Sequence, residues 1–424
     1  MHSHTCLQAG RGSPKVAVLD TIHGAFTLAR RMADMGIEAE ALEVYHHSPG
    51  VADFDLVVAP VHLMPANPAI AEARRLKKRI ITHHQAVGEL VEQSLNSNII
   101  VFEVTGTHSK TSTALLLSKM LSDQKRVVSH TTRGLEIWRN GEARILQTGL
   151  SIAPANVIPA IAAAEAEKAE TFVSEVSLGG TGIADYGILT GFSGDYRIAG
   201  GTKWASTAKL QMVSLAKVGS RLIANTDTGL SSDVSFGARG FVQAELQSLL
   251  FGRDSVALHL GEDLDFQGYQ TAIAGASAAA KAAGFSKGQI ASALDGFDGF
   301  SGRMKVIRQG GVTILDSSNS GLKVRDVSLA MDRAAKAAVA ASGGLALVVG
   351  EESETVCEGM NIPALMALLR GRREEIALLV LVGKRLAPFA AGLGAGTARS
   401  LAEGSDQAMR SGQERLLLCV KCFR

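Results

Sequence analysis

The sequence predicts an α/β protein of three domains, and three observations lead to this expectation. The chain has 424 residues, which is too long for one hydrophobic core and corresponds to roughly three domains. Short apolar runs rich in β-branched residues alternate with stretches of helical spacing, a pattern typical of βαβ units and parallel sheets. Hydrophobic residues make up 46% of the chain and charged residues 20%, which is enough apolar material for packed cores.

Composition also narrows the classes of partner. The net charge is +2 and aromatic residues are 5% of the chain, which argues against nucleic acid as a partner. No apolar run reaches the roughly 18 residues that a membrane span needs, and the N-terminal stretch lacks the apolar segment of a secretory signal. Four cysteines are too few for a disulfide framework in a chain of this size, so a cytoplasmic location is expected.

Residues 1–97 are expected to form a Rossmann-like substrate-binding domain. Short apolar strands are expected at 15–20, 38–45, 54–60 and 79–83. Histidines follow every one of these strands, namely His23, His46, His47, His62, His83 and His84. The carboxyl ends of parallel strands meet at the edge where open α/β sheets bind ligands, so these histidines are expected to form a substrate-binding rim. The alternative for each single histidine is a hydrogen bond to a strand end or to loop backbone.

Residues 98–301 are expected to form a central P-loop ATP-binding domain. The stretch "EVTGTHSKTSTALLLSKML" (103–121) contains a strand, a Gly-Thr turn and a helix that opens with Lys110, Thr111 and Ser112. Backbone N–H groups at such a helix start bind phosphate, while the lysine adds a charge and the hydroxyl can ligate Mg²⁺. Val104 and Ser109 stand where the usual pattern has glycine, so an ordinary helix with a Ser/Thr-rich cap is the alternative. Ser109 is expected to adopt an ordinary negative φ.

Further candidate site residues follow the loop. Glu175 ends an apolar strand in "TFVSEVS", where a carboxylate can hold Mg²⁺ directly or through water. Lys209 is expected to begin a helix, with a solvated helical lysine as the alternative. Arg303 lies in "GFSGRMKVI", the expected joint to the last domain, and two Ala-rich helices are expected before it within 268–297. Asp316 ends the strand of "TILDSSNSGL", for which an Asx-type turn is the alternative.

Residues 302–424 are expected to form an α/β C-terminal domain that completes the ATP site. Buried strands are expected at 311–316, 345–350, 376–383 and 415–420. Cys419 and Cys422 have the spacing of a redox pair or of half a metal site. No second C-x-x-C exists in the chain, so structural cysteines are the preferred interpretation.

Taken in order, these stretches resemble the Mur ligase family from about residue 98 to residue 424. Members carry T-G-T-N-G-K-T, then E-V-S, a lysine, a G-R pair and an acidic strand end. The resemblance implies an ATP-dependent enzyme of three α/β domains in which ATP phosphorylates a substrate carboxylate and a nucleophile displaces the phosphate.

Residue roles follow from the same resemblance by position. The ATP-binding residues would be Gly106, Thr107, His108, Ser109, Lys110, Thr111, Ser112, Asn225, Arg303 and Asp316. Mg²⁺ would be held by Thr111 and Glu175, and the catalytic residues would be Lys110, Glu175 and Lys209. Lys209 matches the lysine that is often carbamylated in this family.

Several motifs differ from those of the Mur ligases that form amide bonds, and the differences point to one branch of the family. Asp195-Tyr196 replaces their D-H pair and Tyr269-Gln270 replaces their H-N pair, while "VLDTIHG", "APVHLMPANP" and "ITHHQAVGEL" are distinctive. These stretches resemble the coenzyme F(430) synthetases. The resemblance implies ATP-dependent cyclisation of a propionate side chain on a nickel seco-tetrapyrrole acid, with ADP and phosphate released. The substrate-binding residues would be His23, His46, His62, His83 and His84.

Two other functions stay open. One is a Mur-like amide ligase that joins an amine to a carboxylate. The other is a nucleotide-gated tetrapyrrole-binding protein. Oligomers are compatible with the sequence.

Overall fold

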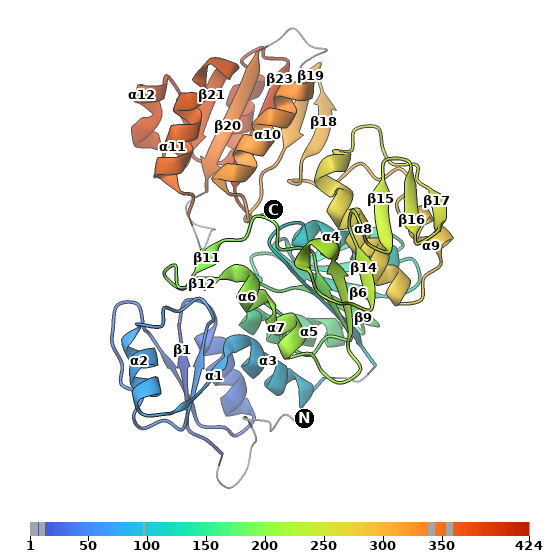
Figure 1. Ribbon diagram of the computed structural model, residues 1–424. Coiled ribbons are helices and arrows are strands. Elements are labelled where there is room, and N and C mark those ends of the chain that lie inside the picture. Colours follow the sequence, from blue (N-terminus) through green and yellow to red (C-terminus); the bar gives the residue numbers. More distant parts are fainter. Residues whose placement is uncertain (1–6, 8–12, 96–97, 338–343, 353–358, 424) are drawn as a thin grey trace. The chain divides into compact units, whose positions relative to one another are not determined.

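The computed structural model has mixed α/β architecture and describes residues 7, 13–95, 98–337, 344–352 and 359–423 (Figure 1). The chain divides into two compact units. The first comprises Met1–Ala257 and Gln270–Ala293, and the second comprises Leu258–Tyr269 and Leu294–Arg424. The predicted domain limits after residues 97 and 301 stay predictions, and residue 97 itself lies outside the described residues.

In the first unit, the N-terminal sheet is parallel, as predicted. Its strands within the described residues run in the order β2 (Ala39–Leu42), β1 (Val16–Leu19), β3 (Leu56–Ala59) and β4 (Arg79–Thr82). Alternate residues of β1 face opposite sides of the sheet. Val16 and Val18 pack with α1 (Ala25–Asp34) and α3 (His83–Glu92), whereas Ala17 and Leu19 pack with α2 (Pro68–Arg75). Because β1 and β3 are parallel, the residues that follow them emerge at the same edge of this sheet.

The second sheet of this unit has a parallel centre with antiparallel flanks. Among the described residues its order is β17 (Asp254–Ala257), β16 (Ser248–Phe251), β15 (Val242–Glu245), β14 (Val234–Phe236), β13 (Arg221–Asn225), β10 (Tyr186–Leu189), β5 (Ile100–Thr105), β9 (Thr171–Glu175), β6 (Val127–Thr131), β7 (Gly134–Arg139) and β8 (Glu142–Gln147). The expected strands at β5, β9 and β13 are present. The hairpins at both flanks were not predicted, although Asn140-Gly141, with φ of 51° and 77°, is a turn sequence typical of hairpins.

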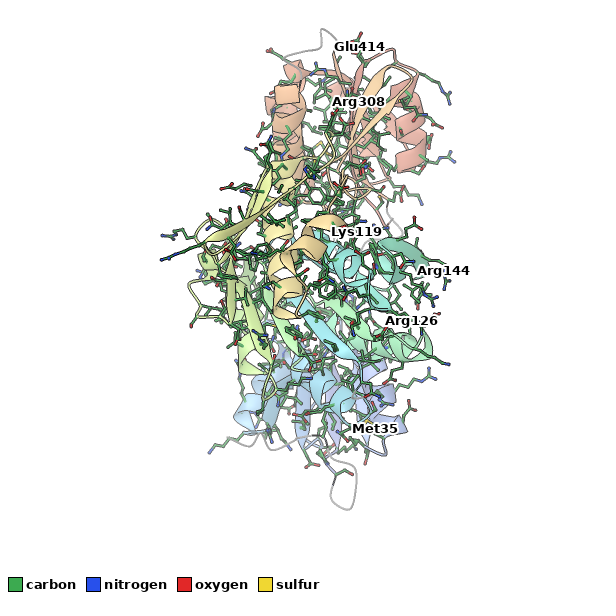
Figure 2. The ribbon with its side chains drawn as sticks, turned by 90° about the vertical axis from the view of Figure 1, so that its right-hand side faces the viewer. Met35, Lys119, Arg126, Arg144, Arg308 and Glu414 are labelled. Atoms are coloured by element: carbon green, nitrogen blue, oxygen red, sulfur yellow. The ribbon has the colours of Figure 1, made fainter. Side chains whose placement is uncertain are left out.

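Helices cover this sheet and position the site. They are α4 (Lys110–Leu121), α5 (Val157–Ala166), α6 (Ala205–Lys209), α7 (Gln211–Ser214), α8 (Phe266–Ala282) and α9 (Lys287–Ala293). The short pair β11 (Arg197–Ile198) and β12 (Lys203–Trp204) precedes α6. At the outer edge, β8 carries exposed charged side chains such as Arg144 (Figure 2). Charges of this kind discourage edge-to-edge pairing with another sheet.

The second unit contains the remaining sheet. Its order among the described residues is β18 (Lys305–Gln309), β19 (Val312–Asp316), β23 (Arg415–Lys421), β20 (Leu345–Glu351), β21 (Ile376–Val382) and β22 (Gly396–Ala398), with only β18 antiparallel. Leu347 and Val349 pack with α10 (Val324–Ala337), α11 (Ile362–Gly371) and α12 (Ala390–Leu393). Val348, on the opposite face, packs with α13 (Leu401–Met409). The expected strands of this region are all present.

Within the described ranges, no helix has the length and apolar character that a membrane span requires.

Candidate functional site

The loop between β5 and α4 is tied to the residues that follow β10. Gly106 has a φ of 149°, and a Cβ added there would lie 2.0 Å from Thr190 Oγ1, so only glycine fits. The Thr107 amide donates to the Gly191 carbonyl at 3.0 Å, and its hydroxyl donates to the Ser193 carbonyl at 2.7 Å. Thr190 Oγ1 donates to the His108 carbonyl at 2.5 Å. These bonds hold the loop in the sharp turn that leads into α4.

Lys110, Thr111 and Glu175 converge at the start of α4. Glu175 ends β9, which pairs with β5, so its carboxylate emerges beside the loop. Thr111 Oγ1 donates to Glu175 Oε2 at 2.7 Å, and Lys110 Nζ lies 4.0 Å from Glu175 Oε1. Glu175 is buried and also accepts a bond of 3.4 Å from the Thr132 amide. A lysine, a hydroxyl and a carboxylate at a helix N-terminus form a donor set that suits a phosphate group and a divalent cation.

The expected negative φ at Ser109 is wrong. Ser109 has a φ of 59° and a ψ of 4°, which is the left-handed region. The turn from the loop into α4 imposes this conformation, and the usual glycine at this position avoids its strain. A left-handed conformation costs a non-glycine residue about 1–2 kcal/mol.

Ser109→Gly should therefore remove strain, whereas Ser112→Gly in the first turn of α4 should only weaken the helix. A glycine inside a helix costs up to about 1 kcal/mol, so Ser109→Gly should be the more stable variant by about 1 kcal/mol. Urea denaturation of the two variants measures this difference. A Ser109→Gly variant that is less stable than Ser112→Gly would contradict the strain.

Lys209 is buried and is the last residue of α6, so the prediction that it begins a helix is wrong. Its Nζ lies 5.6 Å from the centre of the Tyr196 ring. Asp195, the residue before that ring, accepts bonds from the Ser206 amide at 3.0 Å and the Ser206 hydroxyl at 2.5 Å. The Asp195-Tyr196 pair thus fixes the start of α6 and lines the position of Lys209. The solvated alternative for Lys209 is wrong, because its side chain is removed from solvent.

Asn225 and Asp227 support the loop that holds the Thr107 turn. Asn225 Nδ2 donates to the Thr190 carbonyl at 3.1 Å. The Asp227 carboxylate accepts bonds from the Phe192 amide at 3.2 Å and the Ser193 amide at 3.1 Å. The ATP contact that was predicted for Asn225 stays a prediction. Thr190 and Thr132 were not predicted, because a threonine that follows a strand carries no signal of its own.

Arg303 and Asp316 lie in the second unit. Asp316 is buried, and its two oxygens accept bonds of 3.0 Å from the Gly302 amide and 3.0 Å from the Ser318 amide. The second of these bonds is the Asx turn that was the alternative interpretation. The first ties the loop of Arg303 to the end of β19. Their contacts to ATP stay predictions.

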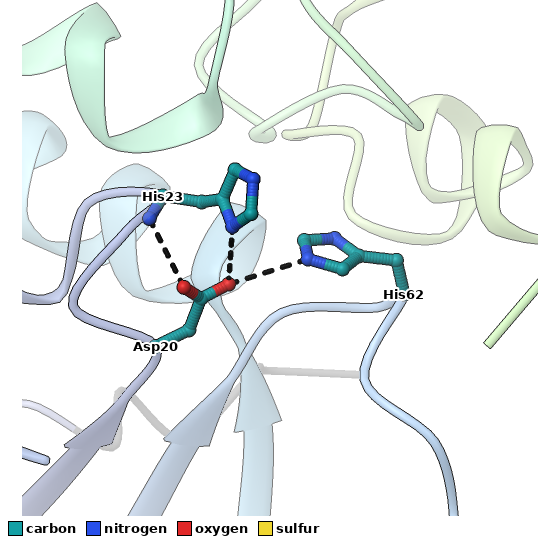
Figure 3. Close-up of side chains that lie close together, drawn as sticks. All are labelled: Asp20, His23 and His62. Atoms are coloured by element: carbon teal, nitrogen blue, oxygen red, sulfur yellow. Dashed lines mark hydrogen bonds and ion pairs between the residues drawn. The ribbon is translucent and has the colours of Figure 1, made fainter. Parts of the chain in front are cut away.

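A cluster around Asp20 lies at the edge of the N-terminal sheet (Figure 3). Asp20 Oδ2 lies 2.7 Å from His23 Nδ1, 3.2 Å from His62 Nε2 and 2.9 Å from the Tyr45 hydroxyl. Asp20 is completely buried and has a φ of 81°. The bonds from His23, His62 and Tyr45 hold the pKa of this carboxyl well below its ordinary value, against the effect of burial. Asp20 and Tyr45 were not predicted, whereas the convergence of two rim histidines was.

The other rim histidines take different environments. His46 and His47 are exposed, and their amides donate to Glu43. His83 and His84 open α3 and are buried; their Nε2 atoms donate to the Leu19 and Ser177 carbonyls at 2.9 and 2.7 Å. Their Nδ1 atoms have no hydrogen-bond partner in the described part of the chain. The predicted substrate contact of His46, His83 and His84 stays a prediction.

Burial makes His83, His84 and His130 sensitive to acid. Desolvation lowers the pKa of His83 to about 4, of His84 to about 3 and of His130 to about 4. The unfolded chain takes up these protons near pH 6.5, so stability is lost as pH falls from about 7 towards 4. Each histidine should remove about 2 kcal/mol of unfolding free energy at pH 5. Urea denaturation between pH 7 and 5 measures how the free energy of unfolding changes with pH. The slope reports the number of protons taken up on unfolding, and His84→Gln should lower that number by about one. An unchanged slope would contradict the assignment.

The two described cysteines are buried free thiols. Cys419 lies within β23 and Cys422 directly follows it, and burial raises the pKa of the Cys419 thiol. Their burial agrees with the structural interpretation. Cys6 and Cys357 lie outside the described residues.

Sequence relatives decide the family. Residues 306–422 match the family model described as coenzyme F430 synthetase CfbE, C-terminal domain. A relative named coenzyme F(430) synthetase, from Methanosarcina acetivorans, is 36% identical and is matched over 97% of this chain and 99% of its own length. The chain belongs to the coenzyme F(430) synthetase family. The predicted family and the prediction of an ATP-dependent ligase are thereby confirmed.

Solved structures share the fold of this coenzyme F(430) synthetase family member. MurF from Acinetobacter baumannii has a TM-score of 0.58 at 16% identity, with 94% of this chain and 95% of that chain covered. A bifunctional folylpolyglutamate synthase/dihydrofolate synthase from Yersinia pestis, complexed with AMPPNP and Mn ion, has a TM-score of 0.54 at 17% identity, with 80% and 90% covered. The predicted Mur-like α/β architecture is therefore confirmed.

Proposed function

We propose that this coenzyme F(430) synthetase family member activates a propionate carboxylate of a nickel seco-tetrapyrrole acid and closes a carbocyclic ring. The observation that carries the proposal is the convergence of Lys110 and Thr111 on the buried carboxylate of Glu175. The name of the 36% identical relative supports a tetrapyrrole substrate. His23 and His62 of the Asp20 cluster, together with His46, His83 and His84, are the proposed contacts to its carboxylates.

The reaction would proceed in two steps. The terminal phosphoryl group of ATP passes to a propionate oxygen, which gives ADP and an acyl-phosphate. A ring carbon of the same molecule then loses a proton and attacks the acyl carbon; a carbon–carbon bond forms and phosphate leaves with the former propionate oxygen. Both reacting groups belong to one substrate, so the enzyme must mainly fold the side chain onto the macrocycle and exclude water.

Residues of the loop supply the phosphate chemistry. The amides of the turn and Lys110 would bind the phosphates and stabilise charge on the transferred group. Thr111 and Glu175 would hold Mg²⁺, and their oxygens, 2.7 Å apart, are ligands of the kind that Mg²⁺ prefers. When bound, the ion neutralises charge that develops on the phosphoryl oxygens. Lys209, buried beside Tyr196, is the proposed third catalytic residue.

Incubation with ATP, Mg²⁺ and the seco-tetrapyrrole acid tests the proposal. We expect ADP to form in step with a tetrapyrrole product whose mass is lower by one water. A requirement for an added amine would favour the amide ligase instead. Binding of the tetrapyrrole without ADP formation would favour the nucleotide-gated binding protein.

A further inference from the structure

The Asp20 cluster has a geometry that the phosphate chemistry does not explain. Its members come from two segments: Asp20 and His23 lie in the loop between β1 and α1, and His62 follows β3. Asp20 Oδ2, His23 Nδ1 and His62 Nε2 all lie within 4.8 Å of one another (Figure 3). The fold thus places one oxygen and two nitrogen atoms, all able to ligate a metal ion, within 4.8 Å of one another.

We propose that Asp20, His23 and His62 bind one divalent transition-metal ion of the Zn²⁺, Ni²⁺ or Co²⁺ class. Ligand atoms about 2.1 Å from a common ion lie about 3.0–3.4 Å apart in tetrahedral or octahedral geometry. The carboxylate oxygen is already 2.7 and 3.2 Å from the two ring nitrogens. Two imidazoles with one carboxylate favour these ions over Mg²⁺, which prefers oxygen ligands.

The proton balance of the cluster permits such an ion. Each ring nitrogen that faces Asp20 carries the proton of its hydrogen bond to the carboxylate. An ion takes the place of these two protons, and each neutral ring can keep its proton on its other nitrogen. The carboxylate contributes a negative charge that partly neutralises the ion.

The surroundings of Asp20 suit the support of a metal ligand. The Ile22 and His23 amides donate to its other oxygen at 3.1 and 3.0 Å, and the Tyr45 hydroxyl donates to Oδ2 at 2.9 Å. Outer contacts of this kind fix ligand orientation in metal sites. The His23 and His62 side chains are each 31% exposed, which leaves the ion a path from solvent and positions open to water or to a carboxylate ligand.

Titration with Ni²⁺ or Co²⁺ alone, followed by calorimetry and by the visible absorption of Co²⁺, tests the site. The parent protein should carry His2→Gln and His4→Gln to remove histidines near the N-terminus, and excess Mg²⁺ should be present to occupy oxygen-rich sites. One equivalent should bind, with Co²⁺ bands typical of nitrogen ligands. Asp20→Asn and His62→Gln should each weaken binding by about 100-fold or more. Asparagine tolerates positive φ, so Asp20→Asn should keep the local backbone.

Exposed histidines of the same region supply the matched control. His46→Gln and His47→Gln should bind the ion as tightly as the parent. The proposal is overturned if Asp20→Asn and His62→Gln bind with unchanged affinity, or if the His46 and His47 variants lose the ion. Circular dichroism of each variant separates loss of the site from loss of the fold. The titration needs neither ATP nor a tetrapyrrole, so its outcome is independent of the proposed function.

Discussion

Lys110→Met should reduce ATP-dependent turnover by about a thousand-fold. The lysine ammonium lies at the start of α4, 4.0 Å from the carboxylate of Glu175, where it can meet a transferred phosphoryl group. Removing a fixed charge from a phosphoryl-transfer site typically costs 10²–10⁵-fold in rate, and about a thousand-fold corresponds to about 4 kcal/mol of transition-state stabilisation. Methionine keeps most of the side-chain volume, so the loss should come from the charge. The rate of ADP formation under saturating ATP measures it.

Lys119 provides the control for this substitution. It lies in the last turn of the same helix, where its ammonium is 3.4 Å from the Gly141 carbonyl. Lys119→Met removes the same charge from the same helix and should leave turnover within about two-fold, because Lys119 lies at the opposite end of α4 from the phosphate loop. Equal losses in the two variants would show that the effect is structural and would remove Lys110 from the proposed mechanism.

Glu175→Gln should reduce turnover by about a hundred-fold and raise the Mg²⁺ concentration needed for half-maximal rate by about ten-fold or more. The glutamine can still accept the bond from Thr111, 2.7 Å away in the native protein, so the local structure should persist. What is lost is the negative charge that would hold the cation. A Mg²⁺ titration of ADP formation gives both quantities.

Glu170 precedes the same strand and supplies the matched control. It is exposed and lies 3.6 Å from Lys125 in a surface ion pair. Glu170→Gln should leave the Mg²⁺ dependence unchanged, because exposed ion pairs contribute little. An unaltered Mg²⁺ dependence in Glu175→Gln would contradict the metal assignment even if the rate falls.

Local sequence patterns predicted the parts of the site that depend on neighbouring residues. The strand, turn and helix around Lys110 and the strand that ends in Glu175 were predicted because each is encoded by one apolar run and its adjoining turn. Pairing of β5 with β9 then brings Thr111 to Glu175. The histidines after β1 and β3 were placed on one edge for the same reason.

Contacts between distant segments could not be predicted in this way. Asp20 and Tyr45 are 25 positions apart, and nothing near either residue indicates that they share a hydrogen bond. The positive φ of Ser109 is imposed by the turn into α4, so it could not be predicted from the serine side chain. The burial of His83 and His84 was not predicted either: Thr82 caps α3, the helix starts at His83, and both rings are buried.

Labelling of the substrate propionate with the heavy oxygen isotope tests the central claim most directly. If ATP activates that carboxylate as an acyl-phosphate, one labelled oxygen must leave with phosphate when the ring carbon attacks. We therefore expect one heavy oxygen atom in each molecule of released phosphate, with ADP unlabelled. Phosphate without label, formed together with cyclised product, would contradict activation of the carboxylate by ATP.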